Sequence, residues 1–207
     1  MAVLKMRYFI NTHKILVPFV ILAMMVYYNN FSIGPVVYLA LHGSYCVNWL
    51  LKELIYPDKS FDEKISVIMS LGGLFTISGY FIAPFLVITS NQTPHLITIF
   101  LAIFCNIVGT FLHFGSDAQK YFVLQNGRGL ITDGFFARCR HTNYLGEVVT
   151  YAGFCVMSEH WLPFAFLFFM FVVIFVPSMN RKEKSLARYE EFREYYMKTN
   201  WITPKLG

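Results

Sequence analysis

The sequence predicts an all-α integral membrane protein with about six transmembrane helices, and two observations support this. Of the 207 residues, 56% are hydrophobic and 14% are charged, whereas an average globular domain has about 25% charged residues. The apolar residues are also gathered into six separate runs, and a helix needs roughly 20 such residues to cross a bilayer. We expect one membrane domain over 1–207, in which 1–114 supply four spans and form a packing or substrate half, and 115–207 form the half that carries the candidate binding motif.

The six expected spans follow the apolar runs in chain order: Ile15–Tyr28, Ile33–Leu51, Ile65–Ile88, His95–Gly115, Tyr144–Ser158 and Trp161–Pro177. The first and the last two runs are short, which predicts helix tilt or local thinning of the bilayer there. Because only 159–160 separate the last two runs, these two spans should form an antiparallel hairpin.

Beyond the sixth span, apolar and aromatic residues recur at intervals of three and four. This period predicts an amphipathic C-terminal helix over about Met179–Lys198. Its apolar face would carry Leu186, Tyr189, Phe192 and Tyr196. We expect this helix to lie on the lipid headgroups.

The distribution of positive charge predicts the orientation in the membrane. All 17 Lys and Arg residues fall in four polar segments: 1–14, 52–64, 115–143 and 178–207. The three other connections contain none: 29–32, 89–94 and 159–160. Since basic loops stay on the cytoplasmic or matrix side, both termini should lie there, close to membrane lipids. No nucleic-acid-binding motif accompanies these charges, so we expect no nucleic-acid partner.

One ionisable residue, Glu147, lies within the fifth expected span. A charge at this depth costs roughly 2.5–3.5 kcal/mol on insertion scales and usually faces a cavity or a partner. We expect Glu147 to face the interior and to contact an arginine or a cofactor amide. It would then be either a functional group or a fastener between two helices.

Polar residues gather at the start of this span, where Arg138, Arg140, His141 and Asn143 lie close together. Arginines beside a helix N-terminus are typical of a site for phosphate or carboxylate. A collar of basic residues that reaches the headgroups would give the same pattern. Both interpretations stay open at this point.

Two earlier segments also carry polar residues of interest. Ser116 or Asp117 could cap a short interfacial helix over Asp117–Leu124, and Asn126-Gly127 is typical of a turn. On the second expected span one helical face carries His42, Tyr45, Trp49 and Lys52. A His–Tyr pair there could polarise a substrate carbonyl, or it could simply pack. The four cysteines lack metal-ligand spacing and are expected to be buried thiols.

Three motifs in family order resemble the steroid 5α-reductase-like membrane proteins. The run Arg140-His-Thr-Asn-Tyr-Leu-Gly-Glu147 resembles their R-H-P-N-Y-x-G-E signature, with Thr142 where most members have Pro. The run Ser116-Asp-Ala-Gln-Lys120 resembles their S-D-x-Q-K motif. The tail from Arg181-Lys-Glu183 to Ile202-x-Pro204 resembles the family's C-terminus. This superfamily also includes the sterol C14-type reductases and the isoprenylcysteine carboxyl methyltransferases.

The resemblance implies a cofactor pocket between the last spans and the loops of the basic face. In the reductase members the cofactor is NADPH. The positions that match its surroundings are Asp117, Lys120, Arg138, Arg140, His141, Asn143, Tyr144, Arg181, Arg188, Tyr189 and Tyr195. The catalytic candidates are Glu147, which belongs to the signature, with Tyr45 and His42, which are chosen for their chemistry alone.

We therefore expect an NADPH-dependent reductase of a conjugated C=C bond in a steroid-like or lipid-like membrane substrate. One alternative is a methyltransferase that uses S-adenosylmethionine on a lipid or prenylated substrate. The other is a non-catalytic subunit of a larger membrane complex, with other membrane subunits as partners and no cofactor. The resemblance favours the endoplasmic reticulum, and the subunit alternative fits the mitochondrial inner membrane.

Overall fold

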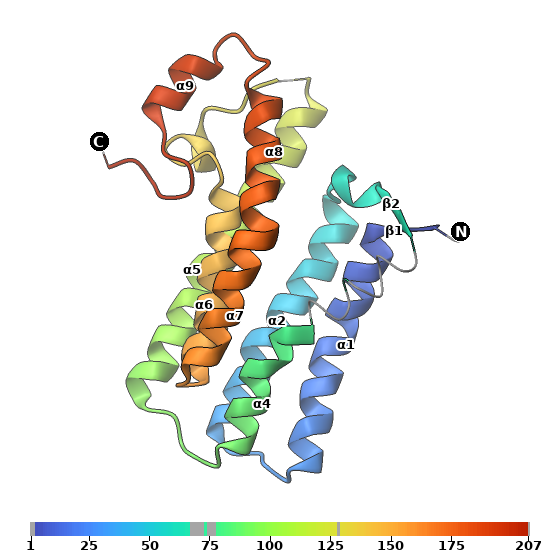
Figure 1. The fold of residues 1–207 in the computed structure, drawn as a ribbon, viewed down its shortest axis with the longest axis vertical. Coiled ribbons are helices and arrows are strands. Elements are labelled where there is room, and N and C mark those ends of the chain that lie inside the picture. The colour runs from blue at the N-terminus through green and yellow to red at the C-terminus, as the bar shows by residue number, and fades with distance from the viewer. Residues whose placement is uncertain (1–2, 67–72, 74–77, 128, 207) are drawn as a thin grey trace.

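A computed structural model of the chain describes residues 3–66, 73, 78–127 and 129–206. Figure 1 shows a bundle of helices that run along one long axis in alternating directions. Part of the expected third span, 67–72 and 74–77, lies outside the described residues.

The longer helices, in chain order, are α1 (Met6–Tyr27), α2 (Ile33–Ile55), α4 (Ile82–Thr89), α5 (Leu96–Gln125), α6 (Thr142–Met157), α7 (Trp161–Met170), α8 (Val176–Leu186) and α9 (Phe192–Lys198). The short helical segments are η1 (Lys59–Asp62), η2 (Ser78–Phe81), η3 (Gly134–Phe136) and the π-helical η4 (Phe171–Phe175), which joins α7 to α8. Two strands pair antiparallel, with Leu4 opposite Ile65: β1 (Val3–Lys5) and β2 (Lys64–Ser66).

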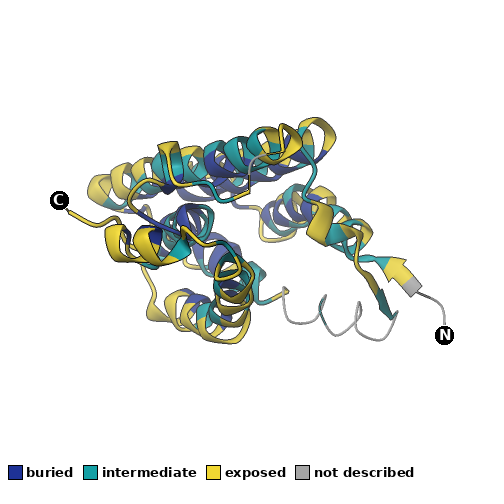
Figure 2. Cartoon of the chain, turned by 90° about the horizontal axis from the view of Figure 1, so that it is seen from above, coloured by how far each residue is buried: buried dark blue, intermediate teal, exposed yellow. Residues whose placement is uncertain are grey.

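The prediction of an all-α membrane protein is confirmed at this level. In the part of the chain that the structure describes, three helical stretches are long and apolar enough to cross a bilayer: α1, α5 and Trp161–Leu186. Apolar side chains on their outer faces are exposed, among them Phe19, Phe111 and Phe168. Seen from above, buried residues line the facing sides of the helices and exposed residues the outer sides (Figure 2). An apolar outer surface of this kind suits a lipid environment.

The bounds of α1 and α5 differ from the expectation. α1 begins at Met6 rather than Ile15, because Lys14 already lies on the buried face that Val17 and Ile21 continue. α5 runs through Gly115 to Gln125, so Asp117 lies inside a helix and no separate helix forms over Asp117–Leu124.

The prediction of a single C-terminal helix over Met179–Lys198 is also wrong. α8 continues the sixth apolar run and ends at Leu186, and α9 begins at Phe192 after a turn. The β1–β2 pair was not predicted, because strands of three residues are too short to show a period of two.

Glycines bring α5 and α6 into close contact. A Cβ on Gly146 would lie well inside van der Waals contact of the His113 backbone nitrogen, and one on Gly109 would lie 2.5 Å from the backbone nitrogen of Thr150. Gly115 likewise leaves room for the ring of Phe135, where a Cβ would lie 2.5 Å from Cζ. Small residues allow helix backbones to approach in this way. The close packing places the signature segment at the start of α6 beside the polar end of α5.

The predicted polar face of α2 is confirmed, since His42, Tyr45, Trp49 and Lys52 are all buried. Other charged or ionisable residues are buried with them: Glu53 of α2, Lys14 of α1, and His113 and Asp117 of α5. A membrane-protein interior excludes such groups unless they have partners or a function. The candidate site therefore lies among these residues.

Candidate active site

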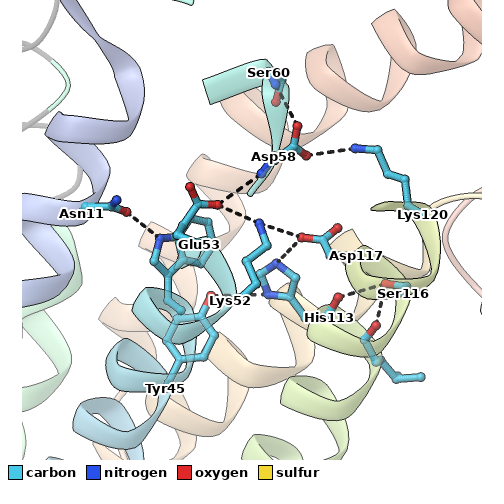
Figure 3. Close-up of polar contacts among 12 residues, drawn as sticks. Asn11, Tyr45, Lys52, Glu53, Asp58, Ser60, His113, Ser116, Asp117 and Lys120 are labelled. Carbon is cyan, nitrogen blue, oxygen red and sulfur yellow. Dashed lines mark hydrogen bonds and ion pairs between the residues drawn. The ribbon is translucent and has the colours of Figure 1, made fainter. Parts of the chain in front are cut away.

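A cluster of charged residues lies where the C-terminal half of α2 meets α5 (Figure 3). Lys52 Nζ lies 3.0 Å from Glu53 Oε1 and 3.3 Å from Asp117 Oδ2. His113 Nε2 lies 3.6 Å from the same Asp117 oxygen. The other oxygens, Glu53 Oε2 and Asp117 Oδ1, are buried without a hydrogen-bond partner among the described residues. Two buried carboxylate oxygens of the cluster therefore have no donor among the described residues, although buried acceptors normally have a hydrogen-bond partner.

A cavity of about 140 Å³ opens beside this cluster. Three of its lining residues are lysines: Lys52, Lys59 and Lys120. Typical ligand pockets measure about 300–1,000 Å³, so this cavity has room for one charged group of a dinucleotide rather than for a whole one. Two carboxylates also line it, Asp58 and Asp117, and each is ion-paired to one of these lysines, so the lysines exceed the acids by one. This small excess of positive charge suits an anionic group.

Asp58 and Lys120 form an ion pair at this cavity, with 2.9 Å between Asp58 Oδ2 and Lys120 Nζ. Burial alone would raise the pKa of Asp58, but the Lys120 ammonium and the Ser60 backbone amide together hold that pKa well below its usual range. Asp58 is therefore ionised at neutral pH and fixes the position of Lys120.

The signature segment before α6 is bound to the C-terminal tail. The Arg140 guanidinium donates through Nε to Glu183 Oε1 (2.9 Å) and through Nη1 to the Thr199 carbonyl (2.7 Å). The backbone amides of Arg140 and His141 donate to the carbonyls of Asn200 and Trp201 (3.0 and 3.1 Å). The tail therefore lies alongside the signature segment. In this structure the Arg140 side chain binds the tail.

His141 shares the same carboxylate, with Nε2 2.9 Å from Glu183 Oε1. Burial, together with the charges of Lys182 and Arg140, lowers the pKa of His141 to about 3. At neutral pH the imidazole is therefore uncharged, and its N–H donates to Glu183. Thr142, which replaces the usual proline of the signature, donates its hydroxyl to the Phe135 carbonyl (2.6 Å).

The other predicted cofactor residues are dispersed through the same region, some buried and some exposed. Tyr195 is buried and donates to the Phe136 carbonyl (2.8 Å), and the Tyr144 ring lies 4.5 Å from Lys182 Nζ. Two arginines make only local contacts, Arg181 with the Ser178 hydroxyl and Arg188 with the Tyr189 hydroxyl. Arg138 contacts the tail through its backbone carbonyl. The Asn143 side chain forms no hydrogen bond with the described residues. The structure thus brings Arg140, His141 and Tyr195 together with the tail, and Asp117 with Lys52.

Glu147 is half-buried on α6. The expected contact with an arginine is not formed within the described residues, because Arg140 is bound to Glu183 instead. The other two catalytic candidates have partners. Tyr45 Oη lies 3.5 Å from His113 Nδ1, and His42 Nδ1 lies 3.3 Å from the Tyr38 hydroxyl.

Comparison with known proteins agrees with the signature. A family model described as "Protein of unknown function (DUF1295)" matches residues 62–199. The chain belongs to this family. DUF1295 proteins lie in the steroid 5α-reductase-like superfamily, so the predicted resemblance is confirmed.

A 91-residue stretch of this DUF1295 protein is 26% identical to the Delta(14)-sterol reductase of Methylotuvimicrobium alcaliphilum. The match covers 42% of this chain and 21% of that reductase, so the two share about a fifth of the relative's length. Together the two comparisons support a reductase-like membrane protein family.

In this DUF1295 member, two buried polar contacts involve residues that the sequence did not single out, Glu183 and Lys14. Glu183 lies within the Arg181-Lys-Glu183 motif, but only the basic residue was considered. Lys14 was assigned to the basic N-terminal segment, although its spacing from Val17 and Ile21 is that of one helical face. That spacing was the available signal for its burial.

Proposed function

We propose that this protein is an NADPH-dependent reductase of a conjugated C=C bond in a steroid-like or lipid-like substrate of the membrane. The observation that carries the proposal is the lysine-lined cavity beside the buried Lys52–Asp117 pair, in a chain of a reductase-like family. Phosphate groups need several convergent cations, and S-adenosylmethionine has no phosphate. The cavity therefore favours the dinucleotide over the methyl donor.

Different residues of the chain would bind different groups of the cofactor. Lys59 and Lys120 would bind a phosphate or an adjoining polar group of the cofactor, and Asp58 would hold Lys120 in place. The unused oxygens of Glu53 and Asp117 would accept hydrogen bonds from ribose hydroxyls or the amide. Arg140, His141 and Tyr195 would contribute indirectly, because they hold the tail that borders the site.

When bound, NADPH supplies the hydride for the β-carbon of the conjugated system. The protein has to hydrogen-bond the carbonyl at the other end, since this stabilises the enolate that develops. Tyr45, His42 and Glu147 are the candidates that the sequence suggested for this polar environment. The apolar outer surface of the helices agrees with a substrate that arrives from the bilayer.

Calorimetry on the purified protein tests the proposal with NADPH and with S-adenosylmethionine as titrants. We expect NADPH to bind, and to bind more weakly as salt is added, because exposed charges are screened over about 8 Å at physiological ionic strength. Lys59→Ala removes a cavity cation that is exposed and should weaken NADPH binding by about tenfold, equivalent to about 1.4 kcal/mol. Lys198→Ala, on the exposed face of α9, is the matched control and should leave binding unchanged.

The outcomes separate the alternatives. If the protein bound S-adenosylmethionine and did not bind NADPH, the methyltransferase alternative would be favoured over the reductase. Binding of neither molecule would favour a structural subunit of a membrane assembly. Equal effects of Lys59→Ala and Lys198→Ala on NADPH affinity would show that the cavity is not part of the NADPH-binding site.

A further inference from the structure

A chain of buried polar side chains leads from the lysine-lined cavity into the interior of the bundle. Its members come from four helices, and each is at most 8% exposed. In order from the cavity they are Asp117, His113, Tyr45, Tyr151 and Lys14. The interior of a membrane protein holds ionisable groups where they have partners or a function. A continuous row of them suggests a path for protons.

His113 has a contact at each of its two ring nitrogens. Nε2 lies 3.6 Å from Asp117 Oδ2, and Nδ1 lies 3.5 Å from the Tyr45 hydroxyl oxygen. Figure 3 shows the ring between these two side chains. Both distances are long for hydrogen bonds, and contacts at catalytic sites commonly shorten when a ligand binds. An imidazole can take up a proton at one nitrogen and release one at the other, so His113 can link the two sides.

The outer end of this chain reaches water. The cavity that Asp117 lines measures about 140 Å³ and is bordered by the exposed Lys59 and Gln125, so it has room for several water molecules. Asp117 Oδ1 is buried and has no hydrogen-bond partner among the described residues. A water molecule in the cavity can therefore donate to Asp117.

The inner end is a pair of tyrosine hydroxyls beside a buried cation. The Tyr45 hydroxyl is hydrogen-bonded to that of Tyr151, and Lys14 Nζ donates to the Tyr151 oxygen at 3.1 Å. Lys14 Nζ also lies 4.6 Å from the centre of the Tyr45 ring. An ammonium group in this place offsets the negative charge that arises when a proton is withdrawn from either hydroxyl.

Charged groups on four helices act on His113. They are Asp117 on its own helix, Lys52 on α2, Lys14 on α1 and Glu147 on α6. Two of these groups are acidic and two are basic, so their effects on the ring oppose one another. The surroundings therefore do not hold His113 permanently in its charged form, which a group that passes protons on requires.

We propose that His113 is a proton-relay residue, which carries protons from the water of the lysine-lined cavity to the buried hydroxyls of Tyr45 and Tyr151. This role rests on the proposed function, because reduction of a C=C bond consumes one proton for each hydride that NADPH supplies. Inside a membrane bundle that proton has to be brought from the aqueous side. In this role His113 contacts neither the substrate nor the cofactor.

Each transfer moves one proton and leaves no net charge on the chain. A proton from the cavity water adds at Nε2, beside Asp117, and the proton at Nδ1 leaves to the Tyr45 oxygen. Tyr45 passes its own proton to the Tyr151 oxygen, which replaces the proton that the reaction has withdrawn from this pair. The His113 ring has then changed tautomer, and it returns to the first tautomer before the next transfer.

The first measurement is nitrogen-15 NMR of the full-length protein in lipid discs, labelled at histidine and free of substrate. The His113 signals are identified by their loss in His113→Gln. In the parent protein we expect both ring nitrogens to exchange between the protonated and the unprotonated form, because a relay uses both tautomers. Tyr45→Phe keeps the aromatic ring and removes the partner at Nδ1, so His113 should then stay in one tautomer.

The second measurement is turnover in H₂O and in D₂O, with NADPH and a steroid that carries a 4-en-3-one group as the probe. His113→Gln and Tyr45→Phe should lower kcat by roughly 100-fold, the lower end of the range for loss of acid–base catalysis. Both should raise the solvent isotope effect on kcat, since proton supply becomes the slow step. The KM for NADPH should change little. His95→Gln, which replaces an exposed histidine at the start of the same helix, is the matched control and should leave all three quantities unchanged.

The outcomes separate the relay from the reductase. A single fixed tautomer of His113 in the parent would overturn the relay, and so would a fall in kcat without a change in the solvent isotope effect, which would assign His113 to packing. NADPH calorimetry on the same samples tests the proposed function independently. Absence of NADPH binding by the parent would reject the reductase itself, whereas normal binding together with an unchanged kcat in His113→Gln would reject the relay alone.

Discussion

Arg140 illustrates how one residue of a family signature can serve the fold. Its guanidinium is buried and bound to Glu183 and Thr199, and its face lies 4.3 Å from the centre of the Tyr196 ring. A planar fork of donors suits this combination of carboxylate, carbonyl and ring, and a lysine would not reproduce it. The effect of Arg140 on a bound anion would therefore pass through the tail.

We predict that Arg140→Lys loosens the tail while it keeps the positive charge. Loss of one charge-assisted hydrogen bond costs about 1.5–3 kcal/mol, so the 192–206 segment should exchange its amide hydrogens faster and be cleaved sooner by protease. Arg138→Lys is the control, because the Arg138 side chain is exposed and only its backbone carbonyl binds the tail. Equal protection of the segment in both variants would contradict this assignment.

His141 makes the docking of the tail dependent on pH. Its pKa in the fold is about 3, while an unperturbed histidine titrates near about 6.5. Between these values the unfolded state binds more protons, so stability is fully present above about pH 6.5 and falls as the pH is lowered toward 3. We predict that acid releases the tail over this window, as followed by limited proteolysis. In His141→Asn the dependence should flatten, and an unchanged pH profile would assign it to another group.

At the scale of elements, the α5–α6 pair positions the candidate site. Gly109 and Gly146 let the two backbones meet, and Glu159, in the turn between α6 and α7, accepts hydrogen bonds from the His95 amide (2.9 Å) and the Thr98 hydroxyl (2.6 Å) at the start of α5. α5 is thus held to the α6–α7 turn at its start and to α6 along its middle. The signature segment and the Lys52–Asp117 cluster depend on this arrangement.

We predict that Gly146→Ala destabilises the protein by about 1–3 kcal/mol, the usual cost of overpacking, because its Cβ would meet the backbone of His113. Gly43→Ala on α2 is the matched control. Its nearest neighbour, Pro18 Cβ, would lie 3.8 Å away, and alanine is favoured over glycine in a helix by about 1 kcal/mol. The midpoint temperature of thermal unfolding in detergent should therefore fall for Gly146→Ala and stay level or rise for Gly43→Ala.

For the whole molecule, the ends of the helices agree with the pattern of charge. The connections 28–32, 90–95 and 158–160 lie at one end of the bundle, and both ends of the described chain lie toward the other (Figure 1). None of these three connections contains a lysine or an arginine. The six-span topology with both termini on the cytoplasmic or matrix side is our proposal from this arrangement.

Cysteine labelling tests this topology. With Cys105 replaced by serine, the other native cysteines are buried and should give little background. A membrane-impermeant reagent should modify Gln92→Cys and Lys198→Cys from opposite sides of sealed vesicles. Modification of both from one side would exclude an arrangement with six crossings.

The sequence by itself determined the membrane class, most helix positions and the family. These properties depend on local composition, on the helical period and on the R-H-x-N-Y-x-G-E run, all of which can be seen within a short window. The polar face of α2 was predictable for the same reason. Even the burial of Lys14 could have been found from its spacing to Val17 and Ile21.

Only the tertiary structure decided which distant residues meet. Arg140 and His141 contact Glu183, Lys52 contacts Asp117, and Lys14 contacts Tyr151. Each pair joins different helices or loops, so its formation depends on how closely those helices approach and how they are rotated. That geometry is set by glycine contacts such as Gly109 with the α6 backbone, and a periodic pattern along one chain segment does not contain it.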